Sequence, residues 1–194
     1  MKTFKKLVLV VFMFGTLFNY ANEKKDFNTI VNAKKVKIEF TNVKKGNYVF
    51  VKDSFGTTLY SEEIKTNGEY LKFFDFSSLR TGNYTLELEK NTEIIESSFS
   101  KEGKAIVFKD NLTKTINKPA IYTKNNSIYI SKLNFDNKGL EVEVFYNDEK
   151  VYTETLKSNS KSLNRVYKLL NDKKGEYTIV AKNNGRNFIK RFKF

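Results

Sequence analysis

The sequence repeats one short phrase at a fixed interval. Gly82 and Tyr84 recur as Gly175 and Tyr177 at an offset of 93 residues, each pair inside a Gly-x-Tyr-Thr segment. Self-similarity that extends over most of a segment indicates two copies of one structural unit. The apolar positions that agree at the same offset are Phe73 with Val166, Phe74 with Tyr167, and Phe99 with Phe192.

Both copies carry the pattern of short β-strands. Apolar and polar residues alternate from Val36 to Phe40 in the first copy and from Leu140 to Val144 in the second, while Asn67-Gly68 is a tight-turn dipeptide. We find no long amphipathic helical pattern. Short strands separated by frequent turn signals predict an all-β chain with two tandem immunoglobulin-like antiparallel β-sandwich domains.

The Gly-x-Tyr phrase has a structural use at a sandwich corner. Glycine lets the chain enter the strand through a positive-φ or crowded position, and the tyrosine can cover the end of the sheet while its hydroxyl reaches the backbone. The alternative is that Tyr84 and Tyr177 are simply core aromatics. Neither interpretation makes these residues a binding site.

The N-terminus has the pattern of a targeting segment. Lys2, Lys5 and Lys6 precede an apolar run from Leu7 to Phe18, and Ala21 is the best small residue for cleavage. An uncleaved anchor is the alternative. We therefore predict a signal peptide over residues 1–21, a tether over 22–33, β-sandwich domain 1 over 34–110, a linker over 111–125 and β-sandwich domain 2 over 126–194, with no transmembrane helix after the signal.

The chain is strongly basic. It has 35 Lys and Arg against 22 Asp and Glu, a formal net charge of +13, and removal of the three lysines in residues 1–21 leaves +10. For an exported protein, in the periplasm, on the outer-membrane surface or outside the cell, this charge favours anionic partners. The predicted partners are another envelope or surface protein, or an anionic polymer such as a glycan or lipopolysaccharide. The alternative is general solubility, and we find no specific nucleic-acid motif.

Two absences exclude much chemistry. The chain has no histidine and no cysteine, which removes Ser-His-Asp and thiol catalysis and most zinc or redox-metal sites. Asn134, Asp136 and Asn137 offer oxygen donors but lack the spacing of an EF-hand loop, so we predict a turn there. We therefore predict no catalytic, metal-binding or cofactor-binding residues and no cofactor.

Carboxylates and tyrosines are the remaining chemical groups. Acids two residues apart on a strand share one face and alternate with apolar residues, which predicts a solvent-facing surface; a carboxylate-based hydrolase is the remote alternative. Most tyrosines are expected in the two cores, although an exposed row could stack on sugars or bases. The acids two residues apart are Glu87 with Glu89 and Glu141 with Glu143, and Glu93 with Glu96 is a further pair three residues apart. The tyrosines are Tyr48, Tyr60, Tyr70, Tyr122, Tyr129, Tyr146 and Tyr152.

The segment from Asp75 to Tyr84 and the basic, apolar end from Ile189 to Phe194 carry a family likeness. There the chain resembles immunoglobulin-like β-sandwich modules of secreted Bacteroidetes proteins, and is similar to the C-terminal sorting domains of type IX secretion cargo. The resemblance implies a β-sandwich module, with secretion or surface attachment as one function. Our leading expectation is an exported, non-enzymatic binding or scaffolding protein of the cell envelope, with the attachment module as the alternative.

Overall fold

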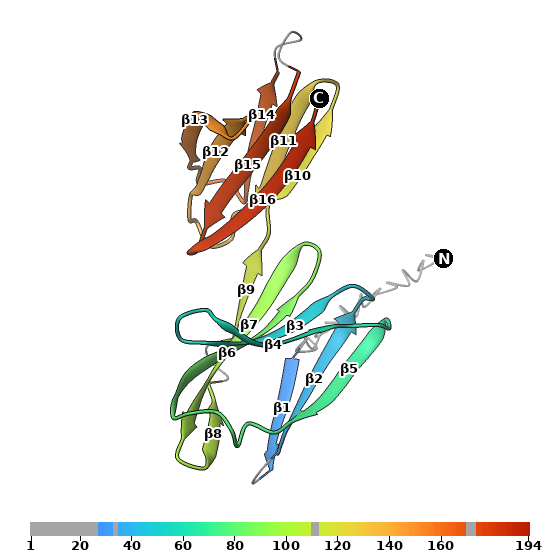
Figure 1. The fold of residues 1–194 in the computed structure, drawn as a ribbon, viewed down its shortest axis with the longest axis vertical. Coiled ribbons are helices and arrows are strands. Elements are labelled where there is room, and N and C mark those ends of the chain that lie inside the picture. The colour runs from blue at the N-terminus through green and yellow to red at the C-terminus, as the bar shows by residue number, and fades with distance from the viewer. Residues whose placement is uncertain (1–26, 33–34, 110–112, 170–173) are drawn as a thin grey trace, which may run out of the picture.

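The computed structural model describes residues 27–32, 35–109, 113–169 and 174–194. All regular structure in these ranges is antiparallel β-strand, arranged as two sandwiches placed end to end (Figure 1). We call β1–β9 unit 1 and β10–β16 unit 2. The predicted signal peptide over residues 1–21 lies outside the described residues.

Unit 1 packs a three-stranded sheet, in the order β1-β2-β5, against a six-stranded sheet, in the order β4-β3-β6-β7-β8 with β9 also paired to β7. The first seven strands of unit 1, β1 to β7, occur in the same chain order and the same sheets as the seven strands of unit 2. Among the described strands, unit 2 has no counterpart of β8 and β9. The strands of unit 1 are β1 (Phe27–Asn32), β2 (Lys35–Val43), β3 (Tyr48–Asp53), β4 (Thr58–Glu63), β5 (Gly68–Phe74), β6 (Gly82–Glu89), β7 (Glu93–Glu102), β8 (Ala105–Phe108) and β9 (Lys114–Asn117).

Unit 2 packs a three-stranded sheet, in the order β10-β11-β14, against a four-stranded sheet, in the order β13-β12-β15-β16. This confirms the predicted tandem immunoglobulin-like sandwiches. The strands of unit 2 are β10 (Ala120–Lys124), β11 (Ser127–Leu133), β12 (Leu140–Tyr146), β13 (Glu149–Leu156), β14 (Ser162–Lys168), β15 (Glu176–Asn183) and β16 (Arg186–Lys193).

Each unit has its own hydrophobic core. In β2, Val36, Ile38 and Phe40 are buried while the residues between them are not, as the alternation predicts. In β12, Leu140, Val142 and Val144 form the matching inward face. The two sets belong to separate clusters of buried side chains, one in each sandwich. Each unit is therefore stabilised largely from within.

The Gly-x-Tyr phrase forms the predicted corner. The Tyr84 hydroxyl donates a hydrogen bond to the carbonyl oxygen of Arg80 at 2.7 Å, and the ring is buried against Phe99. At Gly175 the corner is crowded, because an added Cβ would lie 2.6 Å from Cε2 of Tyr146. The phrase is thus a structural signature in both units.

Replacing Tyr84 by phenylalanine tests the corner. The change removes one hydrogen bond and leaves the ring, so we expect the free energy of unfolding of unit 1 to fall by about 1 kcal/mol. Chemical denaturation measures this loss. Tyr48→Phe is the matched control, since Tyr48 is an exposed tyrosine of the same unit; an equal loss in both variants would show that the corner bond contributes nothing.

Two predicted connecting segments are partly strands instead. Residues 27–32 of the predicted tether form β1, because Phe27 is buried and its ring centroid lies 5.1 Å from that of Phe40. The predicted linker over residues 111–125 contains β9, which pairs with β7, and β10, which pairs with β11. Both predictions are wrong to that extent, and unit 1 extends past the predicted limit at residue 110.

In each sandwich, a cluster of charged and aromatic side chains joins the edge strands of the two sheets. In unit 1, Glu62 on β4 accepts hydrogen bonds from the hydroxyls of Tyr60 and Tyr70 and from the Lys72 ammonium on β5. In unit 2, Glu154 on β13 accepts hydrogen bonds from Arg165 and Tyr167 on β14. In both units the acid is on the edge strand of one sheet and the cation is on the edge strand of the other. The duplication therefore extends to side-chain contacts.

Glu62 makes the stability of unit 1 sensitive to acid. Its hydrogen bonds from Lys72 and Tyr60 lower the pKa of the Glu62 carboxyl to about 2, below its unfolded value of 4.5. A depressed pKa contributes stability that is complete above the unfolded value and is lost as the pH falls toward the folded value. After allowance for solvent screening of this partly exposed group, we expect a loss of about 1 kcal/mol between about pH 5 and about pH 2.

The measurement is the free energy of unfolding of unit 1 as a function of pH. Glu62→Gln should flatten this part of the profile, because the variant has no carboxyl to protonate. Glu69→Gln, at an exposed acid on β5 of the same unit, should leave the profile unchanged. A Glu62→Gln profile as steep as that of the unmodified chain would contradict the assignment.

Candidate functional site at the junction of the two units

The connection between the units is very short. Only Lys118 and Pro119 separate β9, which belongs to a sheet of unit 1, from β10, which belongs to a sheet of unit 2. Lys118 is itself held by unit 1: its backbone N–H donates to the carbonyl of Thr92 at 2.8 Å and its ammonium contacts Glu89 at 2.8 Å. Proline fixes its own φ angle. The junction therefore has little freedom to act as a hinge.

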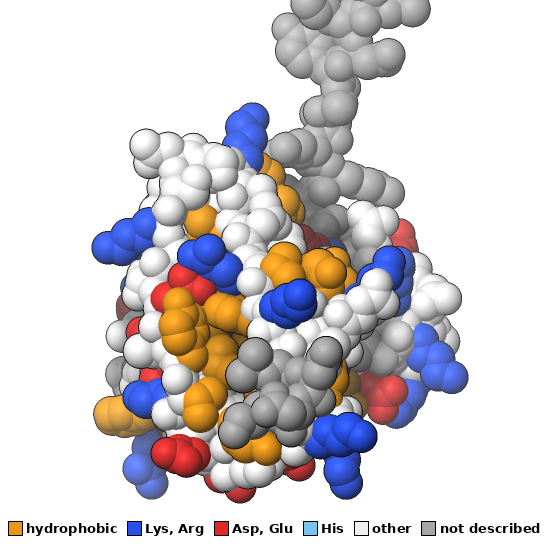
Figure 2. All heavy atoms as spheres, turned by 90° about the horizontal axis from the view of Figure 1, so that it is seen from above, with side chains coloured by type: hydrophobic (Ala, Val, Ile, Leu, Met, Phe, Trp, Pro, Cys, Tyr) orange, Lys and Arg blue, Asp and Glu red, His pale blue; other side chains and the backbone are white. Residues whose placement is uncertain are grey.

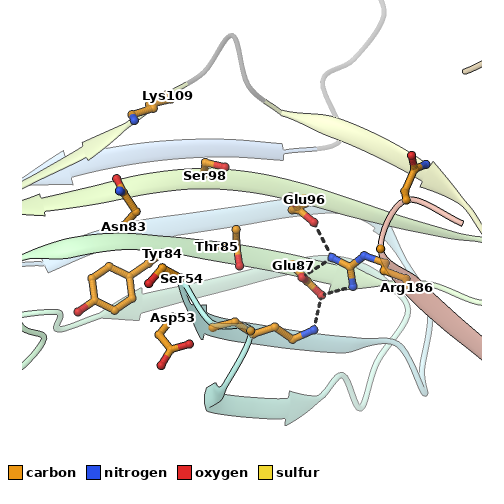
Figure 3. Close-up of a pocket in the computed structure, with 14 residues that line it drawn as sticks. Asp53, Ser54, Asn83, Tyr84, Thr85, Glu87, Glu96, Ser98, Lys109 and Arg186 are labelled. Atoms are coloured by element: carbon orange, nitrogen blue, oxygen red, sulfur yellow. Dashed lines mark hydrogen bonds and ion pairs between the residues drawn. The ribbon is translucent and has the colours of Figure 1, made fainter.

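A tight turn of unit 2 reaches back to unit 1. Asn184 and Gly185, with φ angles of 52° and 72°, join β15 to β16, as the Asn-Asn-Gly sequence predicts. The turn places Arg186 at the end of the hairpin that faces unit 1. Its guanidinium contacts Glu87 on β6 through two hydrogen bonds, of 2.5 and 3.2 Å, and contacts Glu96 on β7 at 2.5 Å (Figure 3).

The two acids are buried and each has a second cation. Glu87 and Glu96 are direct partners in the β6–β7 register and are 2% and 8% exposed. Lys52 lies 2.8 Å from Glu87, and Lys114 lies 2.8 Å from Glu96. We call these five residues, from both units, the junction cluster. It holds three cations and two carboxylates, so its charges are nearly balanced.

The cluster keeps Glu87 ionised. Burial alone would raise the pKa of the Glu87 carboxyl, but the hydrogen bonds from Arg186 and Lys52 outweigh burial and hold that pKa below its usual range. Burial alone would lower the pKa of the Arg186 guanidinium, but its contacts with Glu87 and Glu96 raise that pKa above its usual value. A general acid needs a raised carboxyl pKa, so this arrangement fits an electrostatic clamp better than a proton donor.

The sequence prediction for these acids was partly wrong. Glu87 does lie on the outward face of β6, but it is buried because the β15–β16 turn of unit 2 covers it. Its close acidic partner is Glu96 across the sheet, and the pairs Glu87 with Glu89 and Glu93 with Glu96 do not form a site. Cross-strand register and the approach of the second unit decide this contact, and neither can be read from local spacing.

The other acids are engaged with lysines. Glu89 pairs with Lys118 at 2.8 Å and Glu93 with Lys90 at 3.0 Å. Glu141 and Glu143 share Lys182, at 3.1 and 3.0 Å. These contacts are the surface ion pairs expected on solvent-facing strands. Each described carboxyl with a clearly shifted pKa is shifted downward: Glu62, Asp75, Glu87, Asp136 and Glu143.

A polar cavity of about 540 Å³ lies beside the junction cluster. Figure 3 shows Glu87, Glu96 and Arg186 at one end of this cavity, and Tyr84 and Asp53 at the other. The remaining lining is mainly short polar side chains, including Asn83, Thr85 and Ser98. Glu87 and Glu96 are bound by cations, and Asp53 accepts hydrogen bonds from the backbone N–H groups of Phe55 and Thr57. Each carboxylate of the described lining is therefore already engaged.

The oxygen-rich loop after β11 is a turn, as predicted, and a lysine occupies its centre. The Lys132 ammonium is buried and donates to the carbonyl of Leu133 at 3.0 Å and to Asp136 at 3.3 Å. An ammonium at this position competes with any bound cation. Over the described ranges, no group of three or more Asp or Glu residues is arranged to hold a metal ion.

The tyrosines are divided between the cores and the surface. Tyr122 is 50% exposed and stacks on Tyr129 with ring centroids 5.1 Å apart, on the outward face of β10 and β11. Tyr48 and Tyr152 are also exposed, whereas Tyr60, Tyr70 and Tyr146 are partly buried. Among the described residues, Tyr122 and Tyr129 are the stacked tyrosine pair that resembles the aromatic row considered from sequence. On the face seen in Figure 2, Lys and Arg side chains are scattered among acids and do not form one patch.

Comparisons with known proteins add little to these observations. No protein-family model matches the chain, and no curated protein sequence matches it. Within the described part of the chain, no helix is long and apolar enough to cross a membrane.

Three solved structures show a weak likeness. The first is native alpha-2-macroglobulin from Escherichia coli spanning domains MG0-NIE-MG1, with 9% identity, a TM-score of 0.30, and coverage of 82% of this chain and 59% of that chain. The second is a marsupial T cell receptor, with 10% identity, a TM-score of 0.31, and coverage of 88% of this chain and 62% of that chain. The third is a two fibronectin type-III domain segment from chicken tenascin, with 11% identity, a TM-score of 0.27, and coverage of 88% of this chain and 98% of that chain. The chain thus spans about three fifths of the first two. At such low similarity, the immunoglobulin-like assignment depends on the strand order, register and cores of this chain.

Proposed function

We propose that this chain is an exported, non-enzymatic binding or scaffolding protein of the cell envelope, in which the two units act as one extended body. The observation that carries the proposal is the junction. A strand of unit 1 leads into unit 2 through two residues, and Arg186 of unit 2 is clamped between Glu87 and Glu96 of unit 1. A fixed orientation suits a protein that presents a binding surface at a set distance.

The rest of the chain supports a non-enzymatic role. Histidine and cysteine are absent, and the buried acidic pair of Glu87 and Glu96 is neutralised by three cations. Support for export comes from the basic and apolar N-terminal segment, which has the pattern of a signal peptide. The proposed partners are another envelope or surface protein, or an anionic glycan or lipopolysaccharide.

The test is capture of partners from an envelope fraction by residues 22–194, at about 50 mM and about 500 mM NaCl, because salt screens nonspecific charge attraction. Retention of a discrete partner at the higher salt supports specific binding. Loss of every partner at the higher salt would show that binding is nonspecific charge attraction to a basic protein, and it would overturn the proposed function. Fractionation of cells that express residues 1–194 tests export separately.

Surface attachment is the second candidate, and one observation favours it: β16 is an exposed strand with Arg186, Lys190, Arg191 and Lys193 and no acid. Deleting residues 185–194 would be a poor test, because Phe188, Phe192 and Phe194 pack against the core of unit 2. A sharper test replaces the outward-facing Arg191 and Lys193 by glutamate. An attachment role predicts release of this variant from the surface, whereas the binding role predicts that the variant stays in the envelope fraction and captures less partner.

A further inference from the structure

The equivalent strands β7 of unit 1 and β16 of unit 2 differ in one respect. In unit 1, β7 pairs with β6 on one side and on the other with β8 and β9, which cover residues 99–102 and 93–96. In unit 2, the equivalent strand β16 pairs with β15, and no other described strand pairs with it. An edge strand presents unpaired N–H and C=O groups that can template another strand. The edge that is covered in unit 1 is thus open in unit 2.

The open edge borders a groove with a mixed lining. A cavity of about 510 Å³ lies between β10 and β16, and its apolar lining is Ile121, Tyr122, Phe188 and Ile189 beside Pro119 and Ala120. Its charged lining is Lys190 and the ion pair of Glu89 with Lys118. At the 93-residue offset, the stretch of β16 along this groove corresponds to residues of β7 that β9 covers. There Thr115 of β9 lies opposite the core residue Ile95, which corresponds to Phe188 of β16. A strand added beyond β16 would therefore direct every second side chain into the groove.

Charge indicates the chemistry of that strand. In unit 1 the covered strand carries Glu96 and its covering strand carries Lys114, which lie 2.8 Å apart. In unit 2 the signs are reversed, because β16 carries Lys190, Arg191 and Lys193 beyond the clamped Arg186, and no acid. Two copies of β16 side by side would place like charges opposite each other, which is destabilising. An acidic strand is the complementary occupant.

We propose that β16 is a docking edge for an extended acidic β-strand of a partner protein, which adds to the sheet as an antiparallel strand beyond β16. Its apolar side chains enter the groove beside Phe188 and Ile121, and its carboxylates, on the opposite face of the added strand, contact the outward-facing Arg191 and Lys193. Strand addition of this kind obtains affinity from main-chain hydrogen bonds and specificity from alternate side chains. This inference rests on the proposed binding function and names the partner class.

The first experiment uses residues 22–194 and a blocked peptide of about eight residues that alternates valine with glutamate, a length typical of one strand. We expect saturable binding, with NMR shift changes concentrated in β16 and in Ile121 and Tyr122. Lys193→Glu, on the outward face of β16, should weaken binding about fivefold to tenfold. Lys157→Glu, an equal charge change at an exposed lysine outside β16, should leave it unchanged.

The second experiment supplies the strand within the chain, as β8 is supplied in unit 1 by a short turn after β7. The same Val-Glu segment is joined to Phe194 of residues 1–194 through a Gly-containing turn. We expect the β16 amides to gain protection from hydrogen exchange and unit 2 to unfold at a higher temperature. A version with lysine in place of glutamate should do neither.

Three results would overturn the inference: no binding and no protection in either experiment, equal effects of the acidic and basic strands, or peptide-independent dimers that form through β16. These outcomes are separate from failure of the proposed function. If envelope partners are captured at high salt and Lys193→Glu does not reduce that capture, the binding function stands and the docking edge is wrong. If no partner is captured, the proposed function fails regardless of the peptide.

Discussion

Replacing Phe99 by alanine should lower the free energy of unfolding of unit 1 by about 4 kcal/mol, the range typical of a buried aromatic. Phe99 is 1% exposed, and its ring centroid lies 5.0 Å from those of Phe76 and Phe108. Phe108 belongs to β8, so the covering strand is part of what buries Phe99. Chemical denaturation followed by a probe in unit 1 measures the loss.

Phe192→Ala is the matched control in unit 2, at the same place in the repeat. Its ring is only partly buried, because β16 has no described strand beyond it. We expect a loss of about 2 kcal/mol or less, since less apolar area leaves water and the site opens to solvent. Equal losses at the two positions would contradict the view that the covering strands distinguish unit 1 from unit 2.

Replacing Arg186 by glutamate should separate the two units. The change removes the cation that joins Glu87 to Glu96 and adds a third carboxylate beside them. Breaking a buried ion pair costs about 3–5 kcal/mol when the charges remain buried, and here opening the junction lets the acids regain water. We expect the closed arrangement to lose about 2 kcal/mol or more, which is roughly a 30-fold change in the ratio of closed to open molecules.

NMR relaxation measures this change, because linked units that no longer contact each other tumble with shorter correlation times. Arg191→Glu is the matched control: it is the same substitution on the same strand, at an arginine 3.9 Å from its nearest acid, Glu176. We expect this control to tumble as the unmodified chain does. If the two units of the Arg186→Glu variant also tumble as one body, the short linker alone sets the orientation of one unit relative to the other.

The features that the sequence predicts well are those set by local pattern. Alternation identified β2 and β12, the Asn-Asn-Gly sequence identified the turn before β16, and Gly-x-Tyr identified the corner at Tyr84. Each depends on residues close together in the chain, where side-chain period and backbone preference act directly. The offset of the repeat then extended these assignments to the second unit.

The features that the sequence missed depend on contacts between distant residues. β1 has no clear sequence period, and it forms a strand because Phe27 packs against Phe40. β9 is a four-residue strand that is held by its pairing with β7. The junction cluster needs the β6–β7 register and the approach of Arg186, which is 99 residues from Glu87. No spacing rule within one unit could have brought these groups together.

The coupling of the units is what gives the open edge of β16 a defined position. Arg186 begins β16 and is also the residue clamped by unit 1, so the docking edge starts at the junction itself. A partner strand bound along β16 would therefore lie at a fixed angle to unit 1. This links the proposed scaffolding role to the proposed docking edge through a single residue.

The most direct test of the account is the distribution of distances between the two units. The chain has no cysteine, so Thr66→Cys in unit 1 and Thr153→Cys in unit 2 provide a unique pair of labelling sites, both exposed. Spin labels at these two sites allow the distance to be measured by double electron–electron resonance at neutral pH. A fixed junction predicts one narrow distance distribution that becomes broad when Arg186 is replaced by alanine. A broad distribution in the chain that retains Arg186 would contradict the claim that the two units act as one body.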